Sequence, residues 1–138
     1  MISERKLGCE NNTSLQCSAL KTEWDSYGTP EVTTVHYDLW ELRIETLLPG
    51  WMGPVYIVFD TCEGYRVLDE SRLTQYGSLT GDEFIYIIHD NGWRSIEAGL
   101  QYGLHSEKEY FIVGINDCVS VVSRTPPKVY SPGEPDSR

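Results

Sequence analysis

Three short runs of β-branched and aromatic residues dominate the hydrophobic pattern of this chain. They cover residues 55–59 (VYIVF), 84–88 (FIYII) and 110–115 (YFIVGI). Runs of this length, without polar alternation, are typical of strands that are covered on both faces. Residues 118–123 form a further short apolar element, which fits either a strand or a single helical turn. The pattern therefore predicts a sheet built around the three runs.

Turn signals between the runs predict antiparallel hairpins. Segment 55–68 is predicted to be a hairpin, because a Cys-Glu-Gly turn separates its first run from a second apolar stretch. Asn91-Gly92 is the strongest turn signal in the chain, since a type I′ turn needs positive φ at both central positions. We expect residues 93–98 to pair back on the run before that turn.

Two other segments favour short helices. The first would begin at Ser14 and place three apolar side chains, ending with that of Trp24, on one face by i, i+3, i+7 spacing. The second would begin at Asp69 and continue through 70–76, up to a glycine.

Residues 35–48 fit two patterns. A helix capped by Thr34 would place four apolar residues on one stripe before Pro49-Gly50. A strand would need a central bulge to restore its alternation. The β-branched residues of 32–35 favour the strand.

These elements predict an α+β fold. We expect a mainly antiparallel sheet of about five or six strands, with one or two short helices packed on one face. Residues 1–13 are polar and are expected to form a flexible N-terminal segment, followed by a single domain over 14–124. Residues 125–138 are rich in proline and are expected to be largely disordered beyond Tyr130.

Charge limits the classes of partner. Acidic residues outnumber basic ones by 21 to 11, which gives a net charge of −10. Nucleic-acid affinity depends on cationic contacts to phosphate, so no nucleic-acid partner is expected. The apolar runs are too short to cross a membrane. The N-terminus lacks the apolar core of a signal peptide, so we expect a cytoplasmic protein with its four cysteines reduced.

No catalytic, cofactor or metal motif is present. The three histidines have no partner at zinc-ligand spacing, the cysteines form no C-x-x-C, and no phosphate-binding glycine loop occurs. We therefore expect no cofactor, no metal and no catalytic residues. The alternative is a small enzyme or ligand-binding domain that uses His89 and Cys118 as base and nucleophile, if the fold brings them together.

Acidic residues gather around two of the predicted strands. They lie at the ends of the runs 55–59 and 84–88 or in the connections between them, with two tyrosines among them. If these connections share one rim of the sheet, they form a negative, aromatic patch suited to a protein interface. The predicted partner-binding residues are Asp60, Glu63, Tyr65, Asp69, Glu70, Tyr76, Asp82 and Glu83.

In general character, as a small acidic chain with many tyrosines and no catalytic motif, the sequence resembles the immunity proteins of bacterial toxin systems. That resemblance implies a non-catalytic inhibitor that covers the active site of a basic toxin domain. The protein is expected to be a monomer or a weak homodimer. A homo-oligomeric structural domain is a further alternative, with Trp93, Tyr102 and Tyr110 lining a pocket or a dimer face.

Overall fold

The computed structural model describes residues 16–69, 82–90 and 107–136, and within them the chain forms eleven strands and one 3₁₀ turn. The elements are β1 (Gln16–Ala19), η1 (Asp25–Tyr27), β2 (Glu31–Tyr37), β3 (Leu42–Leu47), β4 (Trp51–Met52), β5 (Val55–Phe59), β6 (Gly64–Asp69), β7 (Ile85–Asp90), β8 (Lys108–Ile112), β9 (Asp117–Ser123), β10 (Lys128–Tyr130) and β11 (Glu134–Pro135).

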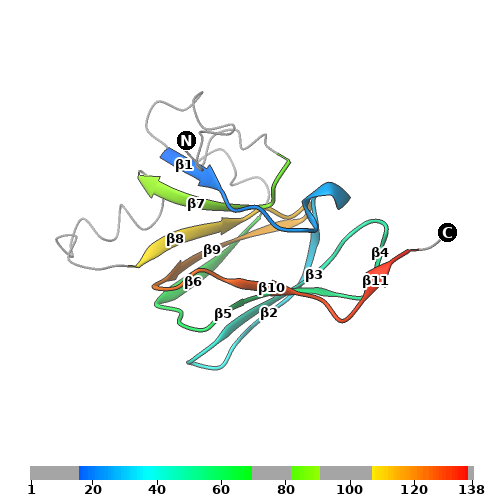
Figure 1. Ribbon diagram of the computed structural model, residues 1–138. Coiled ribbons are helices and arrows are strands. Elements are labelled where there is room, and N and C mark those ends of the chain that lie inside the picture. Colours follow the sequence, from blue (N-terminus) through cyan, green and yellow to red (C-terminus); the bar gives the residue numbers. More distant parts are fainter. Residues whose placement is uncertain (1–15, 70–81, 91–106, 137–138) are drawn as a thin grey trace.

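The strands form three antiparallel sheets, two of which make a sandwich (Figure 1). The larger sheet has the order β1-β7-β8-β9-β6, the second has the order β10-β5-β3-β2, and β11 pairs with β4 in a small third sheet. One apolar core fills the space between the two larger sheets. It joins Ile44 and Phe59 of the four-stranded sheet to Tyr110 and Val121 of the five-stranded sheet.

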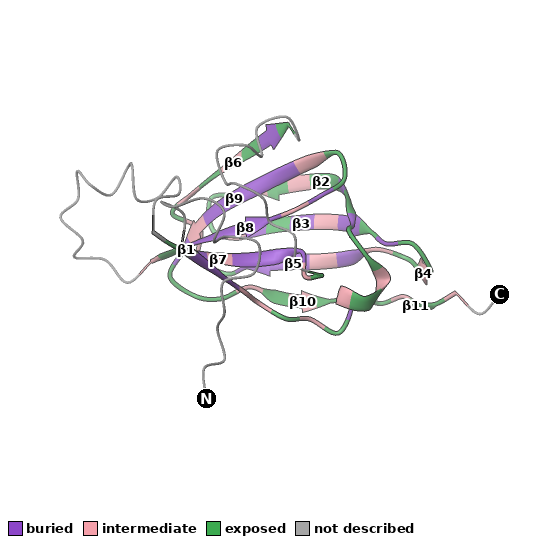
Figure 2. Ribbon diagram, turned by 90° about the horizontal axis from the view of Figure 1, so that it is seen from above, coloured by how far each residue is buried: buried purple, intermediate pink, exposed green. Residues whose placement is uncertain are grey.

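Position within each sheet explains which side chains are buried. On β3, Leu42 and Ile44 face the core and are fully buried, while the alternate residue Arg43 is exposed. On β5, Val55, Ile57 and Phe59 face the core and are fully buried, and the alternate residue Val58 is also buried, between its neighbours Arg43 of β3 and Lys128 of β10. Burial is concentrated in central strands such as β8 and β9, while β10 and much of β2 are exposed (Figure 2).

The expectation of an α+β fold is wrong, because the described residues form an all-β structure without an α-helix. The predicted helix that begins at Ser14 is replaced, over its described part, by β1 and the short 3₁₀ turn η1. In β1, Cys17 and Ala19 lie in one cluster and pair with β7, so strand pairing overrides a local helical spacing. The predicted helix 70–76 and the predicted Asn91-Gly92 turn lie outside the described residues.

Residues 35–48 are strand, as favoured from the β-branched residues, but they contain a tight turn in place of a central bulge. β2 and β3 pair as an antiparallel hairpin, with Tyr37 opposite Leu42. The alternation of apolar and polar residues therefore changes phase within 35–48 because the chain reverses direction there. A register irregularity does occur in β2, between Val32 and Thr34, outside the predicted position.

The predicted hairpin over 55–68 is also wrong. β5 and β6 are consecutive in sequence, but they belong to different sheets, so the chain crosses the sandwich between them. The strands predicted at 84–88 and 110–115 correspond to β7 and β8, and residues 118–123, which fitted either a strand or a helical turn, form β9.

The proline-rich tail is ordered further than the sequence indicates. It contributes β10 to the four-stranded sheet, and β11 follows beyond Tyr130. Val129 packs against the core, and Ser131 accepts a hydrogen bond of 2.8 Å from the indole nitrogen of Trp51. These contacts compensate for the low hydrophobicity of the segment.

The cysteines do not all have reduced thiols, since Cys17 belongs to a disulfide bond while Cys62 and Cys118 are free. None of the helical segments within the described ranges has the length and hydropathy needed to span a membrane.

Candidate protein-binding surface

The most exposed large apolar side chains lie at the tip of the β2–β3 hairpin. Leu39 and Trp40 occupy the middle of the turn 38–41 and are 77% and 80% exposed. The turn projects at the lower end of the sandwich in Figure 1. Large apolar side chains this exposed bury little surface within their own domain, which points to a contact outside it.

A network centred on Asp38 holds the turn in shape. The Asp38 carboxylate accepts hydrogen bonds from the backbone N–H of Trp40, at 3.0 Å, and of Glu41, at 2.8 Å. The Asp38 N–H in turn donates to the Glu41 carbonyl at 3.3 Å. Asp38 therefore fixes the backbone of the two-residue turn by hydrogen bonds, and the side chains of Leu39 and Trp40 extend into solvent.

Leu39 has a backbone conformation that leucine rarely adopts. Its φ is 80°, and it is the one non-glycine residue with positive φ in the described part of the chain. A turn of this kind usually has glycine or asparagine at such a position, because a branched side chain is strained there. Strain at an exposed position suggests that the leucine side chain serves contact with another molecule, at some cost to stability.

Leu39→Gly is therefore expected to stabilise the free protein. Glycine adopts a positive φ without strain, although it also increases the conformational entropy of the unfolded chain. The first effect should exceed the second and raise the free energy of unfolding by about 0.5–1 kcal/mol. Denaturant unfolding of the two proteins measures this. Trp40→Gly is the matched control, because no positive φ is relieved there. Equal or lower stability of Leu39→Gly would show that the turn is unstrained.

The hydrogen bonds from the Glu41 and Trp40 N–H groups hold the pKa of the Asp38 carboxyl below its ordinary value of 3.8. The pKa of Asp38 is lower in the folded protein than in the unfolded chain. The Asp38 carboxylate therefore stabilises the fold at pH values above its ordinary pKa, and this stabilisation is lost as the pH falls through the folded-state pKa. We expect the amide NMR shifts of Trp40 and Glu41 to titrate with a midpoint below pH 3.8. Asp38→Asn keeps the acceptor oxygen and should abolish the titration; a midpoint above 3.8 would contradict the arrangement.

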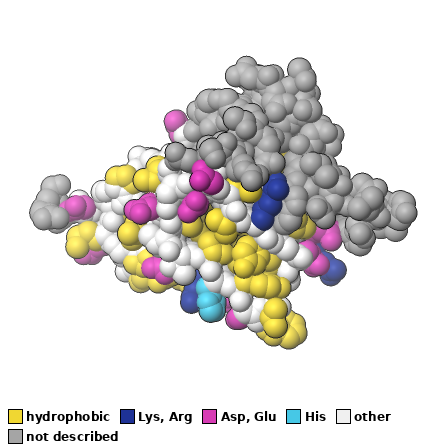
Figure 3. Space-filling view, turned by 180° about the vertical axis from the view of Figure 1, so that it is seen from behind, with side chains coloured by type: hydrophobic (Ala, Val, Ile, Leu, Met, Phe, Trp, Pro, Cys, Tyr) yellow, Lys and Arg dark blue, Asp and Glu magenta, His cyan; other side chains and the backbone are white. Residues whose placement is uncertain are grey.

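Apolar side chains continue from the hairpin onto the neighbouring strand β6. The rings of Tyr37 and Tyr65 meet edge to face, with centroids 5.4 Å apart. Tyr65 is 36% and Val67 47% exposed. Figure 3 shows hydrophobic side chains gathered toward the lower end of the molecule, where the hairpin ends. We call the set of Tyr37, Leu39, Trp40, Tyr65 and Val67 the tip surface.

Acidic groups surround the tip surface. Asp38 and Glu41 flank the two apolar residues of the turn. Glu63 precedes β6 and forms an ion pair with Arg124 at 3.1 Å, and Asp60 follows β5 and pairs with Lys128 at 3.1 Å. Neither Asp38 nor Glu41 has a cationic partner among the described residues. The unpaired charge at the tip is negative.

The structure separates the six predicted partner-binding residues that lie within its described ranges. Asp60, Glu63 and Tyr65 lie at the hairpin end of the sandwich. Asp69 lies at the other end of β6, opposite Asp117.

Two further predicted residues, Asp82 and Glu83, precede β7 and lie at the same end of the five-stranded sheet as Asp69. The Glu83 side chain is only 7% exposed, and its Oε2 lies 3.7 Å from the Lys21 ammonium. Glu70 and Tyr76 lie outside the described residues. The six described residues therefore do not form one rim.

Sequence reasoning missed Leu39 and Trp40. A signal for them exists, because two large apolar residues stand between acids in the sequence Asp-Leu-Trp-Glu, where a core strand would continue its alternation.

The alternative catalytic pair is not brought together. Cys118 is fully buried in the cluster on the outer face of the five-stranded sheet. His89 is exposed, and its Nε2 lies 2.7 Å from Ser18 Oγ. Alternation along β7 places His89 on the opposite face from that cluster, with β8 between the two strands. Tyr110, named for the oligomer alternative, is buried in the main core, whereas Trp93 and Tyr102 lie outside the described residues.

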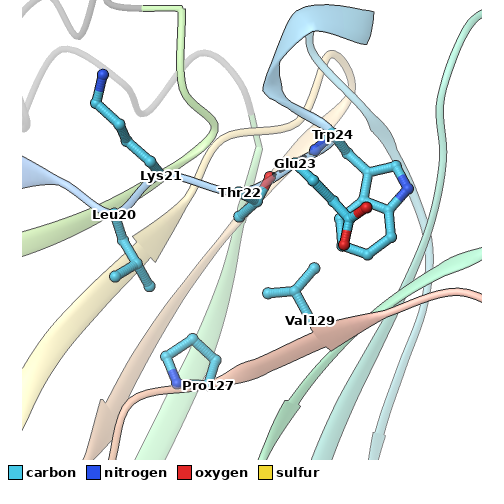
Figure 4. Close-up of a pocket in the computed structure, with 7 residues that line it drawn as sticks. All are labelled: Leu20, Lys21, Thr22, Glu23, Trp24, Pro127 and Val129. Carbon is cyan, nitrogen blue, oxygen red and sulfur yellow. Dashed lines mark hydrogen bonds between the residues drawn. The ribbon is translucent and has the colours of Figure 1, made fainter.

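A pocket of about 290 Å³ opens between the β1–η1 connection and β10 (Figure 4). Its walls mix apolar groups, such as Leu20 and Val129, with Lys21 and Glu23. The indole nitrogen of Trp24 points away from the pocket in this view. In the described ranges no three His, Cys, Asp or Glu side chains are grouped to hold a metal ion. The pocket lining contains one carboxylate and one ammonium group, and neither a histidine nor a cysteine.

A β-sandwich with an acidic, apolar hairpin tip is thus the class of structure that these residues define. Comparisons with protein families, with curated proteins and with solved structures find no match to the chain. Fold and surface alone carry the functional argument.

Proposed function

We propose that the protein is a non-catalytic binding module that inserts its β2–β3 hairpin tip into an apolar pocket of a basic protein. The observation that carries the proposal is the exposure of Leu39 and Trp40 on a strained turn fixed by Asp38. Aromatic side chains that enter a partner's pocket provide much of the energy of protein interfaces. A preorganised turn lowers the entropy lost on binding.

Charge supports a basic partner. The net charge is −10, and the unpaired carboxylates of Asp38 and Glu41 flank the apolar tip. Complementary charge accelerates encounter and discriminates against acidic competitors. An anionic membrane surface would repel these carboxylates, so a protein pocket suits the tip better than a lipid headgroup layer.

In its specific form the proposal is an immunity-type inhibitor that neutralises a basic toxin domain. The α+β part of the resemblance to immunity proteins no longer supports it, because the fold is all-β. The remaining support is the acidic charge and the projecting tip, which is shaped to enter a cleft such as an active site. A monomeric inhibitor remains part of this proposal, whereas the disulfide bond of Cys17 favours an oxidising compartment over the cytoplasm expected from the sequence.

The proposal is tested with the partner captured from cells that make the protein and then purified. The association rate of the two pure proteins should fall steeply as salt rises, and Glu41→Lys should lower it further. Glu134→Lys is the matched control, since Glu134 is an exposed acid on β11, away from the hairpin. An acidic partner, or an association rate independent of salt, would refute electrostatic steering. A partner that keeps its full activity in the complex would refute inhibition.

A further inference from the structure

The two packed sheets differ in width by one strand. Tyr65 and Val67 of β6 lie opposite Val121 and Val119 of β9 and share their face of the sheet. Val119 and Val121 are fully buried under the four-stranded sheet, whereas Tyr65 and Val67 are 36% and 47% exposed. Among the described strands, the second sheet ends at β2, so β6 extends beyond it. The core-directed face of β6 is covered only in part.

The free edge of β2 lies beside this uncovered face, since Tyr37 at the end of β2 meets Tyr65 of β6. The backbone of Asp38 bonds across the hairpin to Glu41. Bonding direction alternates along an antiparallel strand, so Val35 and Tyr37 direct their N–H and C=O groups away from β3. Their neighbouring position is unoccupied in the described part of the four-stranded sheet.

At the start of the β2 edge, the Asn116 side chain makes the backbone hydrogen bonds that a neighbouring strand would make. The Asn116 carboxamide accepts a hydrogen bond from the Val32 N–H at 3.1 Å and donates one to the Val32 carbonyl at 2.9 Å. These are the two bonds that a paired strand would make to Val32. The Asn116 amide therefore pairs with the backbone N–H and C=O of Val32, the first residue of β2 whose backbone groups point away from β3. The next such residues along the strand are Val35 and Tyr37.

We infer that an extended, lysine- or arginine-bearing strand of the partner pairs with β2 at Val35 and Tyr37 and covers Tyr65 and Val67 of β6. Strand addition of this kind gains main-chain hydrogen bonds and buries alternate side chains. The added strand would complete the narrower sheet. Its cationic character follows from Glu31 at one end of β2 and the acids of the hairpin turn at the other. The expectation that the added strand is cationic rests on the proposed function.

Model peptides test the inference. The probe is a peptide of about seven residues that alternates lysine with valine, and its controls carry glutamate in place of lysine or a central proline. We expect the lysine peptide to slow hydrogen exchange at the Val35 and Tyr37 amides. The proline peptide has the same charge but cannot complete the ladder, so it should bind at least about tenfold more weakly. Equal binding of the two would overturn strand addition.

A substitution on β6 gives a second test that leaves the β2 backbone intact. Val67→Lys places a charge under the added strand and should weaken the lysine peptide at least about tenfold. Met52→Lys is the matched control, because Met52 is 51% exposed and lies on β4. Unchanged affinity of Val67→Lys would contradict the inference.

Two outcomes separate this inference from its alternatives. If exchange at Val35 slows with protein concentration alone, a second copy occupies the edge and the inference is wrong. If the peptides fail to bind while the basic partner still contacts the hairpin tip, strand addition is refuted and the proposed function stands.

Discussion

Trp40→Ala is expected to weaken binding of the basic partner by about 2–4 kcal/mol, or roughly 30- to 700-fold in Kd. The indole is 80% exposed in the free protein, so its truncation should leave the thermal unfolding midpoint almost unchanged. A large loss of affinity without a loss of stability identifies a residue whose contacts lie in the partner.

Calorimetry with the purified partner measures this effect. Met52→Ala provides the control, because that side chain is similarly apolar and 51% exposed but lies on β4. Its affinity should equal that of the unmodified protein. A Trp40→Ala variant that binds with unchanged Kd would remove the hairpin tip from the interface.

Phe59→Ala is expected to cause a large loss of stability, about 3–5 kcal/mol. Phe59 is fully buried, and its ring lies 5.4 Å from that of Tyr110 across the sandwich core. Truncation would leave a cavity where the two sheets meet. Because small domains have only about 5–15 kcal/mol of total stability, the unfolding midpoint should fall markedly.

Denaturant unfolding checks this result, with Ile115→Ala as the control. Ile115 is 58% exposed, and its truncation should change the free energy of unfolding by about 0.5 kcal/mol or less. A cost for Phe59→Ala close to that of the control would contradict a core between the two sheets at this position.

The buried strands could be predicted because their signal is local. β5, β7 and β8 carry β-branched and aromatic residues in short runs, and burial on both faces requires such runs. The partner of each strand is a long-range property. The chain reverses direction at Cys62-Glu63-Gly64 and also crosses to the other sheet, and a turn motif does not distinguish the two outcomes.

The hairpin at 38–41 had no recognisable turn sequence. Prediction of a tight turn depends on glycine or asparagine at positions of positive φ, and here Leu39 occupies such a position at 80°. Leu39, the residue that made the turn unrecognisable in the sequence, is also exposed at its tip. Local turn preference therefore failed at the residue on which the proposed function rests.

The structure brings together only some of the residues that the sequence placed in one acidic patch. Tyr65 belongs to the tip surface, and Glu63 precedes the same strand. Asp69 does not lie near the tip surface, because it ends a strand that extends about 17 Å from Gly64. Sequence proximity placed these acids together, while the length and direction of β6 place them at opposite ends of the sandwich.

Photo-crosslinking beside Trp40 shows directly whether the hairpin tip contacts another protein. A benzophenone amino acid is incorporated at position 41, so that Trp40 is kept, or, as control, at position 52, and each protein is irradiated in the cells that make it. Mass spectrometry then identifies the adducts. We expect one basic protein crosslinked from position 41 and absent from position 52. No adduct at position 41, or the same adducts from both positions, would contradict binding through the hairpin tip.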